Sequence, residues 1–194
     1  MMHNTIKYCT VCGSKTQQLI PDGDERLRHV CTECDNIHYL NPKIITGCLI
    51  EHDNKILLCR RAIEPQAGKW TLPAGFMENN ETCSEGAARE TQEEANASVS
   101  GLELYSLYDI PHISHVYMIY RARLASPEYS PGVESLDVQL FDKDNIPWQE
   151  LAFSVIRQTL ISYFNDKKSG DFSLKTGIIT AEMKSLLTIK PPGF

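Results

Sequence analysis

The sequence predicts an α/β protein in which a mixed β-sheet lies between helices, with a small cysteine-bearing domain in front of it. Strand-like runs rich in β-branched and aromatic residues alternate with helical periodicity between residues 44 and 165. A strand, a glycine turn and an acidic helix follow one another from Trp70 to Ala97. Two Cys-x2-Cys pairs precede them. These three observations define the expected fold class.

Length and composition set the limits of that fold. A chain of 194 residues with 42% hydrophobic content can form one principal domain and a small one. We expect the cysteine-bearing domain over residues 1–42, the α/β domain over 43–166 and a polar, loosely packed tail over 167–194. The apolar runs are too short for a membrane span, and no signal or transit peptide is visible, so we expect a cytoplasmic protein.

The cysteine pairs have the spacing of a zinc ribbon. Cys9 and Cys12 form the first pair, and Cys31 and Cys34 form the second after an interval of 18 residues. Two such pairs are a strong zinc signal, and four thiolates close a tetrahedral shell that has no position for substrate water. We therefore expect a structural Zn²⁺ ion that stabilises a segment with almost no core of its own.

Two alternatives to a structural zinc site are weaker. Disulfides are disfavoured because three cysteines remain, Cys48, Cys59 and Cys83, and they lie in apolar contexts. Nucleic-acid binding is disfavoured because residues 1–43 hold five basic and five acidic side chains, and the whole chain has a net charge of −6. A contribution of the ribbon to a subunit contact or to one wall of a substrate site stays open.

The α/β domain begins with a hairpin. Residues 44–51 and 55–61 are expected to be two strands joined by the turn-forming cluster His52-Asp53-Asn54. Further strands are expected over residues 98–107, 116–124 and 138–141, which are rich in β-branched and aromatic residues. Helical spacing returns from Trp148 to Asn165, where apolar side chains can cover the sheet: Leu151, Val155, Leu160, Ile161 and Phe164.

A block of charged residues carries the chemistry. Its spacing is G-x5-E-x7-R-E-x-x-E-E, with defined positions at Gly75, Glu81, Arg89, Glu90, Glu93 and Glu94. A helix that starts at Thr82 or Ser84 places the last three carboxylates within a sector of roughly 100°. A divalent cation or a proton relieves their repulsion, and hard oxygen ligands select Mg²⁺ or Mn²⁺. Arg89 can hold one carboxylate in place while the others bind metal.

The residues in front of this helix favour a metal site over a solvated acidic face. Trp70 to Gly75 is expected to be a strand that ends in a Pro/Gly turn, where Gly75 lets the backbone approach a ligand closely. The whole unit resembles the Nudix box, G-x5-E-x7-R-E-U-x-E-E-x-G-U, at every charged position. Asn96 stands where the box has glycine, and Thr91 and Ala97 replace its bulky aliphatic residues. Because asparagine tolerates the left-handed conformation, we expect Asn96 to end the helix.

The resemblance implies the Nudix α/β/α sandwich and hydrolysis of a nucleoside diphosphate linked to a moiety X. The Mg²⁺ or Mn²⁺ ligands that it implies are Glu90, Glu93, Glu94 and a carbonyl of Ala74 or Gly75, with Glu81 in the outer shell. It implies catalytic roles for Glu93, Glu94 and Arg89, and for an acid on a later loop.

Glu134 is the expected loop acid, as metal ligand or general base, because a turn precedes it and an apolar strand follows it. Asp137 and Glu128 are its competitors, and a loop acid without a role is the alternative.

Further resemblances concern the moiety X. Ribbon-bearing NADH pyrophosphatases carry the motif Ser-Gln-Pro-Trp-Pro-Phe-Pro, but here the segment from Tyr105 to His115 takes its place. A closer similarity, from the ribbon to about Phe164, is to the plant chloroplast Nudix hydrolase 23 type, a FAD and ADP-ribose diphosphatase. The matching stretches are Ile20-Pro21-Asp22-Gly23, Asn41-Pro42-Lys43, residues 47–52 and 70–75, Asp109-Ile110-Pro111 and Glu134-Ser135-Leu136. This resemblance implies hydrolysis of FAD to FMN and AMP, with ADP-ribose or NADH as alternative dinucleotide substrates.

Two other functions are disfavoured. A non-catalytic nucleotide sensor conflicts with the complete set of box carboxylates. An adaptor for RNA, including hydrolysis of a nucleotide cap, conflicts with the neutral ribbon, although a protein adaptor stays open. For dinucleotide binding we expect Arg61, at the end of the second strand, to contact a phosphate. Some aromatic residues can stack on a base, although core packing is their commoner role: Trp70, Tyr105, Tyr108, Tyr117 and Tyr120. His112 and His115 lie in the segment that replaces the NADH motif, where they could reach a ribose or a phosphate, although a loop histidine more commonly faces solvent. The resemblance also implies a homodimer.

Overall fold

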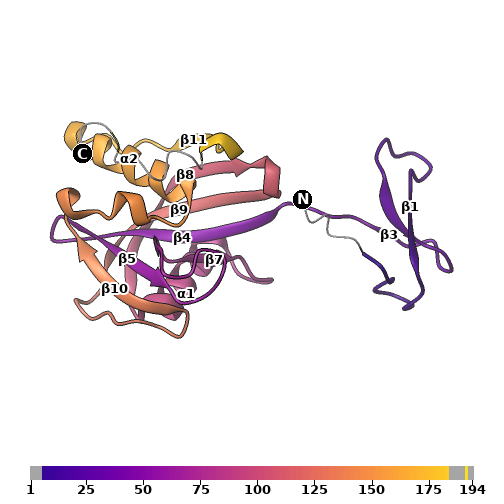
Figure 1. Ribbon diagram of the computed structural model, residues 1–194, viewed down its shortest axis with the longest axis horizontal. Helices are drawn as coiled ribbons and strands as arrows, with labels where there is room; N and C mark the ends of the chain where they lie inside the picture. The colour runs from indigo at the N-terminus through magenta and orange to yellow at the C-terminus, as the bar shows by residue number, and fades with distance from the viewer. Residues whose placement is uncertain (1–5, 184–190, 192–194) are drawn as a thin grey trace. The chain divides into compact units, whose positions relative to one another are not determined.

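The computed structural model describes residues 6–183 and 191, and the chain divides into two units, 1–41 and 42–194 (Figure 1). The first unit is an antiparallel sheet with the order β1 (Thr16–Leu19), β2 (Arg28–Cys31), β3 (Ile37–His38). A bridge between Tyr8 and Lys15 closes the turn that carries the first cysteine pair. This unit has the small, strand-based form that was expected of a ribbon.

The second unit is built on an eight-stranded sheet. Its main path runs β10, β5, β4, β9, β8, β11, with β6 paired to β5 and β7 paired to β4. The strand bounds are β4 (Lys43–His52), β5 (Lys55–Arg61), β6 (Trp70–Thr71), β7 (Ala74–Phe76), β8 (Val99–Ile110), β9 (His115–Leu124), β10 (Ser135–Phe141) and β11 (Lys175–Ile178). The β4–β9 and β8–β11 pairs are parallel and the others are antiparallel, so the sheet is mixed.

Two α-helices cover opposite faces of this sheet, α1 (Cys83–Ala95) and α2 (Ser154–Ser169) (Figure 1). Because side chains alternate along a strand, neighbouring residues of β4 enter different cores. Cys48 and Ile50 lie in the cluster that contains Ala87 of α1, whereas Leu49 lies in the cluster that contains Leu160 of α2. The predicted α/β/α sandwich with a mixed sheet, preceded by a cysteine-bearing unit, is confirmed.

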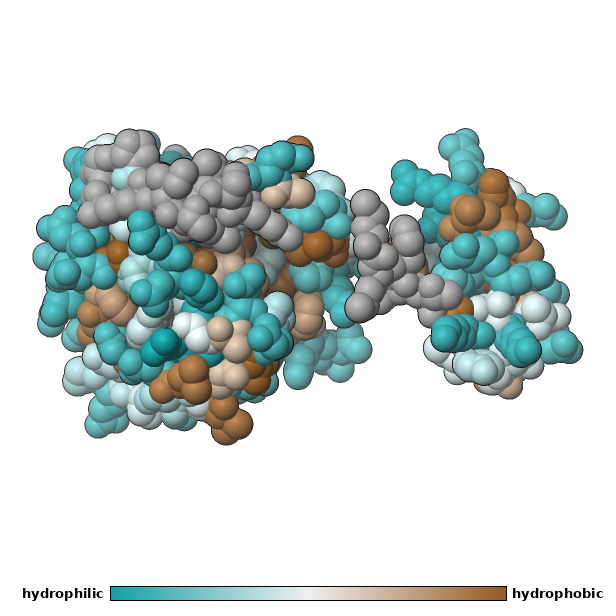
Figure 2. All heavy atoms as spheres, viewed as in Figure 1, coloured by the Kyte–Doolittle hydropathy of each residue, from teal (hydrophilic) through white to brown (hydrophobic). Residues whose placement is uncertain are grey.

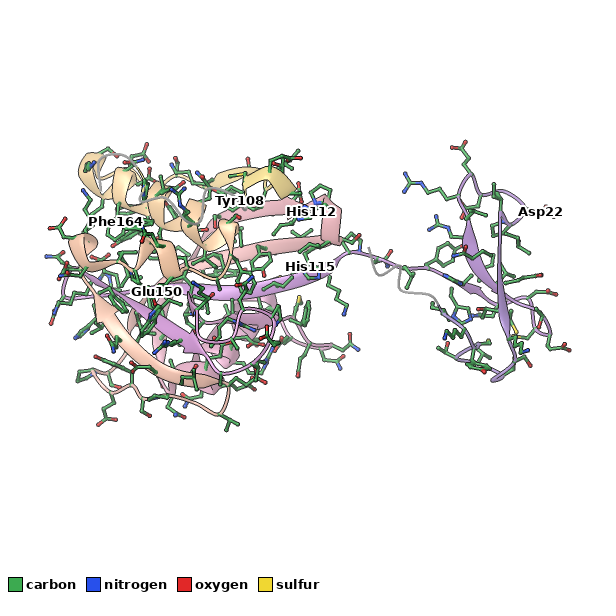
Figure 3. The ribbon with its side chains drawn as sticks, viewed as in Figure 1. Asp22, Tyr108, His112, His115, Glu150 and Phe164 are labelled. Carbon is green, nitrogen blue, oxygen red and sulfur yellow. The ribbon has the colours of Figure 1, made fainter. Side chains whose placement is uncertain are left out.

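The core beneath α2 is rich in aromatic residues. Tyr105, Tyr163 and Phe164 are buried there, and Figure 3 shows Phe164 and Tyr108 on this side of the sheet. Hydrophilic and scattered hydrophobic side chains share the visible surface of the second unit (Figure 2). No helix among the described residues is long and apolar enough to cross a membrane.

The segment from Trp148 to Asn165 is not one continuous helix as predicted. Trp148–Glu150 is a short 3₁₀ turn, as are Pro111–Ile113 and Lys143–Asn145, and α2 begins only at Ser154. The interruption has a partner: Leu151 forms a parallel bridge with Trp70, and the Ala152 N–H donates to the Trp70 carbonyl at 2.8 Å. Backbone pairing with β6 therefore overrides helical periodicity over residues 151–153.

The prediction of a loose tail from Lys167 is wrong over the described residues. Helix α2 continues to Ser169 and ends at Gly170, which adopts the left-handed conformation. The chain then returns as β11, which pairs in parallel with residues 106–109 of β8 and adds a strand to the sheet. Ile179 is buried immediately after it. Residues 184–190 and 192–194 of the expected tail lie outside the described residues.

Three predicted strands differ from the structure by more than one residue at an end. The strand expected over 98–107 continues to Ile110, because residues 108–110 still pair with β9. The strand expected over 138–141 begins earlier, at Ser135, and pairs with β5 through an irregular register. The strand expected from Trp70 to Gly75 breaks after Thr71, and Gly75 lies within β7, paired with Thr46, instead of in a turn.

Candidate active site and structural metal centre

The four cysteines of the first unit meet at one point. The Sγ atoms of Cys9, Cys12, Cys31 and Cys34 all lie within 4.8 Å of one another. The Cys9–Cys34 sulfurs are 3.7 Å apart and the Cys12–Cys31 sulfurs are 3.4 Å apart, too far for disulfide bonds. Four sulfurs around a tetrahedral Zn²⁺ ion, each about 2.3 Å from it, lie about 3.8 Å from one another. The donor set and its spacing therefore fit a structural zinc ion.

Hydrogen bonds from the protein reach the sulfurs of Cys31 and Cys12. The backbone N–H groups of Glu33 and Cys34 both donate to Cys31 Sγ at 3.4 Å. Hydrogen bonds from the backbone and the side chain of Ser14 lower the pKa of the Cys12 thiol to about 6. Because the thiolate is the form that binds metal, these contacts favour ion binding.

Helix α1 begins and ends where the sequence predicts. Thr82 is its N-cap: the hydroxyl accepts from the Glu85 backbone N–H at 3.2 Å, and the Glu85 carboxylate accepts from the Thr82 N–H at 2.7 Å. Asn96 ends the helix in the left-handed conformation, with φ of 46°. Ala87 and Ala95 are fully buried on the sheet side. Both ends and one face are fixed, so the height of the acidic residues above the sheet is fixed too.

Glu90 packs against the backbone of Gly75. A Cβ atom on Gly75 would lie 2.3 Å from the Glu90 carboxylate, so a side chain at Gly75 would displace this acid. Burial raises the pKa of Glu90, and the neighbouring Arg89 opposes that rise. From the sequence, Gly75 was expected to leave room for a ligand. In the structure, the space left by its missing side chain is occupied by the Glu90 carboxylate.

Glu94 is a buried acid with an unsatisfied oxygen. Only 7% of the surface of Glu94 is exposed. Within the described chain, its Oε2 atom has no hydrogen-bond partner. Burial, and then the charge of Glu90, raise the pKa of Glu94 to about 8, whereas Arg61 and the Ala74 backbone N–H oppose the rise. A buried carboxylate oxygen without a partner is destabilising, and a divalent cation satisfies it. This observation fits the predicted Mg²⁺ or Mn²⁺ site.

Arg89 binds three carboxylates. Its Nε and Nη2 atoms donate to Glu81 at 3.0 and 2.9 Å, and its Nη1 atom donates to Glu90 at 2.8 Å and to Glu93 at 3.0 Å. Nη2 also donates to the carbonyl of Phe76 at 3.1 Å. The bond from Arg89 is the main reason that the pKa of Glu81 falls to about 2. Arg89 therefore ties the helix to β7 as well as orienting its acids.

The acids of α1 are less closely gathered than the cysteines. Among the described residues, only the cysteine group brings its ligand atoms within 4.8 Å of one another. Arg89 draws Glu90 and Glu93 toward itself, and Glu93 is an exposed side chain. Only one oxygen of Glu93 is bound to Arg89, at 3.0 Å, so the other oxygen is not used by this ion pair.

Glu134 lies on a loop that is fixed on both sides. The Gly132 N–H donates to the Glu94 carbonyl at 3.0 Å, and the Ala62 N–H donates to the Glu134 carbonyl at 2.8 Å. A Cβ atom on Gly132 would lie 1.7 Å from the Glu93 carbonyl oxygen, so the loop passes directly against α1. In addition to burial, the charge of Glu134 raises the pKa of both Glu90 and Glu94. The structure therefore brings Glu134 beside the acids of α1.

Sequence reasoning missed Gly132 as a part of this site, although the Pro131-Gly132 turn was a visible signal. Asp137 was one of the two alternatives to Glu134 as the loop acid. It lies within β10 instead of on the loop and accepts a hydrogen bond from Gln139 at 2.6 Å.

Arg61 brings a positive charge to the acidic residues. It ends β5, its Nε atom donates to the Pro65 carbonyl at 2.9 Å, and its guanidinium lies 5.3 Å from the centre of the Phe153 ring. Burial raises the pKa of Tyr117 and the pKa of Glu94. In both cases the positive charge of Arg61 lowers the pKa. Arg61 and Tyr117 thus both lie near Glu94, where a phosphate contact was expected.

Most other residues considered for dinucleotide binding do not reach this place. Trp70, Tyr105 and Tyr108 are buried in the core, and Tyr120 is partly buried. His112 is exposed as expected, but His115 begins β9 and its ring packs edge-on against Phe76, with 5.5 Å between ring centres (Figure 3). His115 is partly exposed and belongs to the start of the strand instead of the loop.

The two units match two family models. Residues 7–40 match the Nudix N-terminal zinc ribbon, and residues 41–159 match the NUDIX domain. The acidic helix, its glycine and the sandwich around them thus have the form of a Nudix domain. The chain belongs to the Nudix family.

Individual relatives agree with this assignment. A NUDIX hydrolase from Nitrosomonas europaea, known from its crystal structure, is 52% identical, with a TM-score of 0.88 over 90% of this chain and 99% of that one. The ADP-ribose pyrophosphatase of Methanocaldococcus jannaschii is 32% identical over 59% of this chain and 69% of that protein. The NAD-capped RNA hydrolase NudC of Vibrio atlanticus is 28% identical over 85% of this chain. The chain spans 60% of the length of that NudC protein.

Proposed function

We propose that the protein hydrolyses the pyrophosphate bond of a dinucleotide with Mg²⁺ or Mn²⁺, and that it prefers FAD, which it cleaves to FMN and AMP. One observation carries the proposal: the buried Glu94 carboxylate has an oxygen without a hydrogen-bond partner in the described chain and lies beside Glu90. The charged form of such an acid is unfavourable unless a cation binds there.

The residues that hold the cation in this proposal are Glu90, Glu93, Glu94 and a carbonyl of Ala74 or Gly75, with Glu81 in the outer shell. A bound divalent cation neutralises the diphosphate and lowers the pKa of the attacking water. Arg89 keeps Glu81 and Glu90 oriented through the ion pairs described above. The four cysteines hold a structural Zn²⁺ ion outside this reaction.

Two further side chains act on the substrate directly in this scheme. The guanidinium of Arg61 binds a phosphate oxygen. It lies close enough to the acids for its charge to lower the pKa of Glu94. Glu134 is exposed, beside the acids of α1, and acts as the general base that removes a proton from the attacking water. Glu93, also exposed, is the second candidate for this proton transfer.

The preference for FAD rests on the stretches that resemble the plant chloroplast type, several of which lie outside the box and the ribbon. ADP-ribose is the second candidate because the Methanocaldococcus jannaschii relative is an ADP-ribose pyrophosphatase. NADH is the third: the NudC relatives are NAD-capped RNA hydrolases, but the motif typical of NADH pyrophosphatases is absent from this chain. A homodimer remains part of the proposal, to be tested by light scattering.

A competition assay tests the proposal. The full-length protein is incubated with equal concentrations of FAD, ADP-ribose and NADH and with Mg²⁺ or Mn²⁺, and the products are separated by chromatography. We expect FMN and AMP to form first, and we expect no product when a chelator removes the divalent cation. Preferential cleavage of ADP-ribose or NADH would overturn the FAD preference alone. Intact substrates in every reaction would overturn the hydrolase assignment of this chain.

A further inference from the structure

The side chain of Asn96 makes contacts that glycine cannot make. Its Nδ2 atom donates to the Pro131 carbonyl at 3.0 Å, to the Ser130 hydroxyl at 3.2 Å and, at a longer 3.4 Å, to the Ser130 carbonyl. Ser130 and Pro131 are 34 and 35 residues away in sequence. The amide of Asn96 thus connects the end of α1 to a distant loop.

These contacts are additional to what the helix end itself requires. The backbone of Asn96 is left-handed, with φ of 46°, and its N–H donates to the Gln92 carbonyl. Glycine satisfies both conditions without strain. The Nudix box has glycine at this position, so the side chain of Asn96 serves something other than the cap.

The loop that Asn96 holds is residues 130–134, which we name the clamp loop. It binds the last turn of α1 through backbone hydrogen bonds, from the Ser130 N–H to the Ala95 carbonyl at 2.9 Å and from the Gly132 N–H to the Glu94 carbonyl at 3.0 Å. Glu134 closes the loop, with its own carbonyl held by Ala62 at 2.8 Å. The clamp loop therefore bridges the end of α1 and the end of β5.

Glu134 depends on this bridge for its position. Its side chain is exposed, so the surrounding protein does not confine the carboxylate, and the placement of the loop backbone decides how far it lies from Glu90 and Glu94. The direct contacts between the loop and α1 are few and lie at one end of the helix. Removal of the Asn96 amide removes its side-chain hydrogen bonds to Ser130 and Pro131.

We propose that Asn96 is a positioning residue whose side-chain amide clamps loop 130–134 onto α1 and so sets the position of the Glu134 carboxylate relative to the acids of α1. The inference rests on the proposed function in one respect, the role of Glu134 as general base. The clamp itself is a property of the chain that can be measured without turnover.

Three variants of the full-length protein separate the clamp from the cap. Asn96→Gly keeps the left-handed helix end and removes the amide. Asn96→Asp also tolerates that conformation but replaces the donor by an acceptor that faces the carbonyls of Ser130 and Pro131. Asn54→Gly is the matched control, because Asn54 is a left-handed asparagine, φ 64°, in the turn between β4 and β5.

Each variant is measured in two ways. The first is kcat and KM for FAD with Mg²⁺. The second, in metal-free buffer, is amide hydrogen exchange of the peptide that covers residues 126–134, which reports the clamp loop whether or not the enzyme turns over.

If Asn96 positions Glu134, Asn96→Gly lowers kcat by about tenfold, with KM within about twofold, and speeds exchange of the clamp loop. Asn96→Asp changes both in the same direction, because its carboxylate cannot donate to the carbonyls of Ser130 and Pro131, and Asn54→Gly has no effect. We expect the melting temperature to change by no more than a few degrees in all three.

Other outcomes overturn the inference in distinguishable ways. Unchanged exchange in Asn96→Gly removes the clamp, and faster exchange with wild-type kcat removes its role in positioning Glu134. A fall in kcat of equal size in Asn54→Gly also removes it, because the effect is then not specific to the clamp loop. Absence of turnover in the wild-type protein overturns the proposed function instead, and the exchange measurement still decides whether the clamp exists.

Discussion

The cysteine group of the first unit and the acidic face of α1 both collect metal-binding side chains, yet they differ in what surrounds them. In the described part of the first unit, the buried apolar side chains are Cys9, Val30 and Cys31. The second unit has a core on each face of its sheet. Where the core is this small, the metal itself must stabilise the fold; where the core is large, it can support an unfavourable buried acid such as Glu94.

The change expected to have the largest effect breaks the cysteine site. Cys31→Ser removes a buried ligand, and structural zinc sites contribute roughly 10 kcal/mol of apparent binding energy to folding. We expect loss of bound zinc, measured by atomic absorption, and rapid hydrogen exchange over residues 7–40, with little change in the second unit. Cys83→Ser is the control, since Cys83 lies outside the cysteine group. Full zinc content and an unaltered first unit in Cys31→Ser would reject the structural role.

The second largest effect is expected at the acidic site, and on activity instead of folding. Glu94→Gln keeps the shape of the side chain but removes the charge that binds the cation, so we expect kcat to fall by about a hundredfold or more. In chelator, above the Glu94 pKa of about 8, the melting temperature should stay the same or rise, because a neutral amide then replaces a buried charged carboxylate. Glu103→Gln, on β8, serves as the control. Wild-type turnover in Glu94→Gln would remove this acid from the site.

A smaller effect is expected at Glu134. Loss of a general base lowers the rate by about a hundredfold or more, but Glu93 can replace part of this function, so we expect a loss of about tenfold to a hundredfold in Glu134→Gln. The loss should appear in kcat and not in KM for FAD. Glu128→Gln, on the same long loop, should behave as wild type. The reverse ranking of these two variants would transfer the role to Glu128.

The smallest effect is a dependence of stability on pH. The folded protein holds the Glu94 proton up to a pKa of about 8, compared with an ordinary value of 4.5. Ionisation of this group therefore opposes folding, and the stability of the metal-free protein should fall as pH rises through that interval. In urea unfolding with chelator, Glu94→Gln should show a weaker fall than wild type. Equal slopes in both proteins would show that Glu94 is not buried as the structure has it.

Local signals in the sequence were sufficient for the framework of the candidate active site. The spacing of the box residues, the Thr82 cap and the left-handed Asn96 were all predictable, because each depends on neighbours within a few residues. Features that depend on distant partners were not. Strand β11 is four residues long and includes Gly177, so only its pairing with β8 makes it a strand.

The same limit applies to the segment before α2 and to the clamp loop. Leu151 and Ala152 lie in a segment with helical spacing but pair with Trp70. Gly132 is required only because a carbonyl of α1 lies against it, and the sequence does not show that α1 and residues 130–134 meet. Contacts over 30 or more residues, such as those of Asn96, thus define the parts of the site that sequence patterns leave out.

The most direct measurement of the central claim is a crystal of this protein soaked with Mn²⁺ and a non-hydrolysable FAD analogue, with anomalous scattering to locate the metal. We expect manganese peaks between the carboxylates of Glu90 and Glu94 and the diphosphate, with the diphosphate within reach of Arg61. Manganese and diphosphate bound together at another place on the second unit, with the acids of α1 facing only solvent, would contradict it.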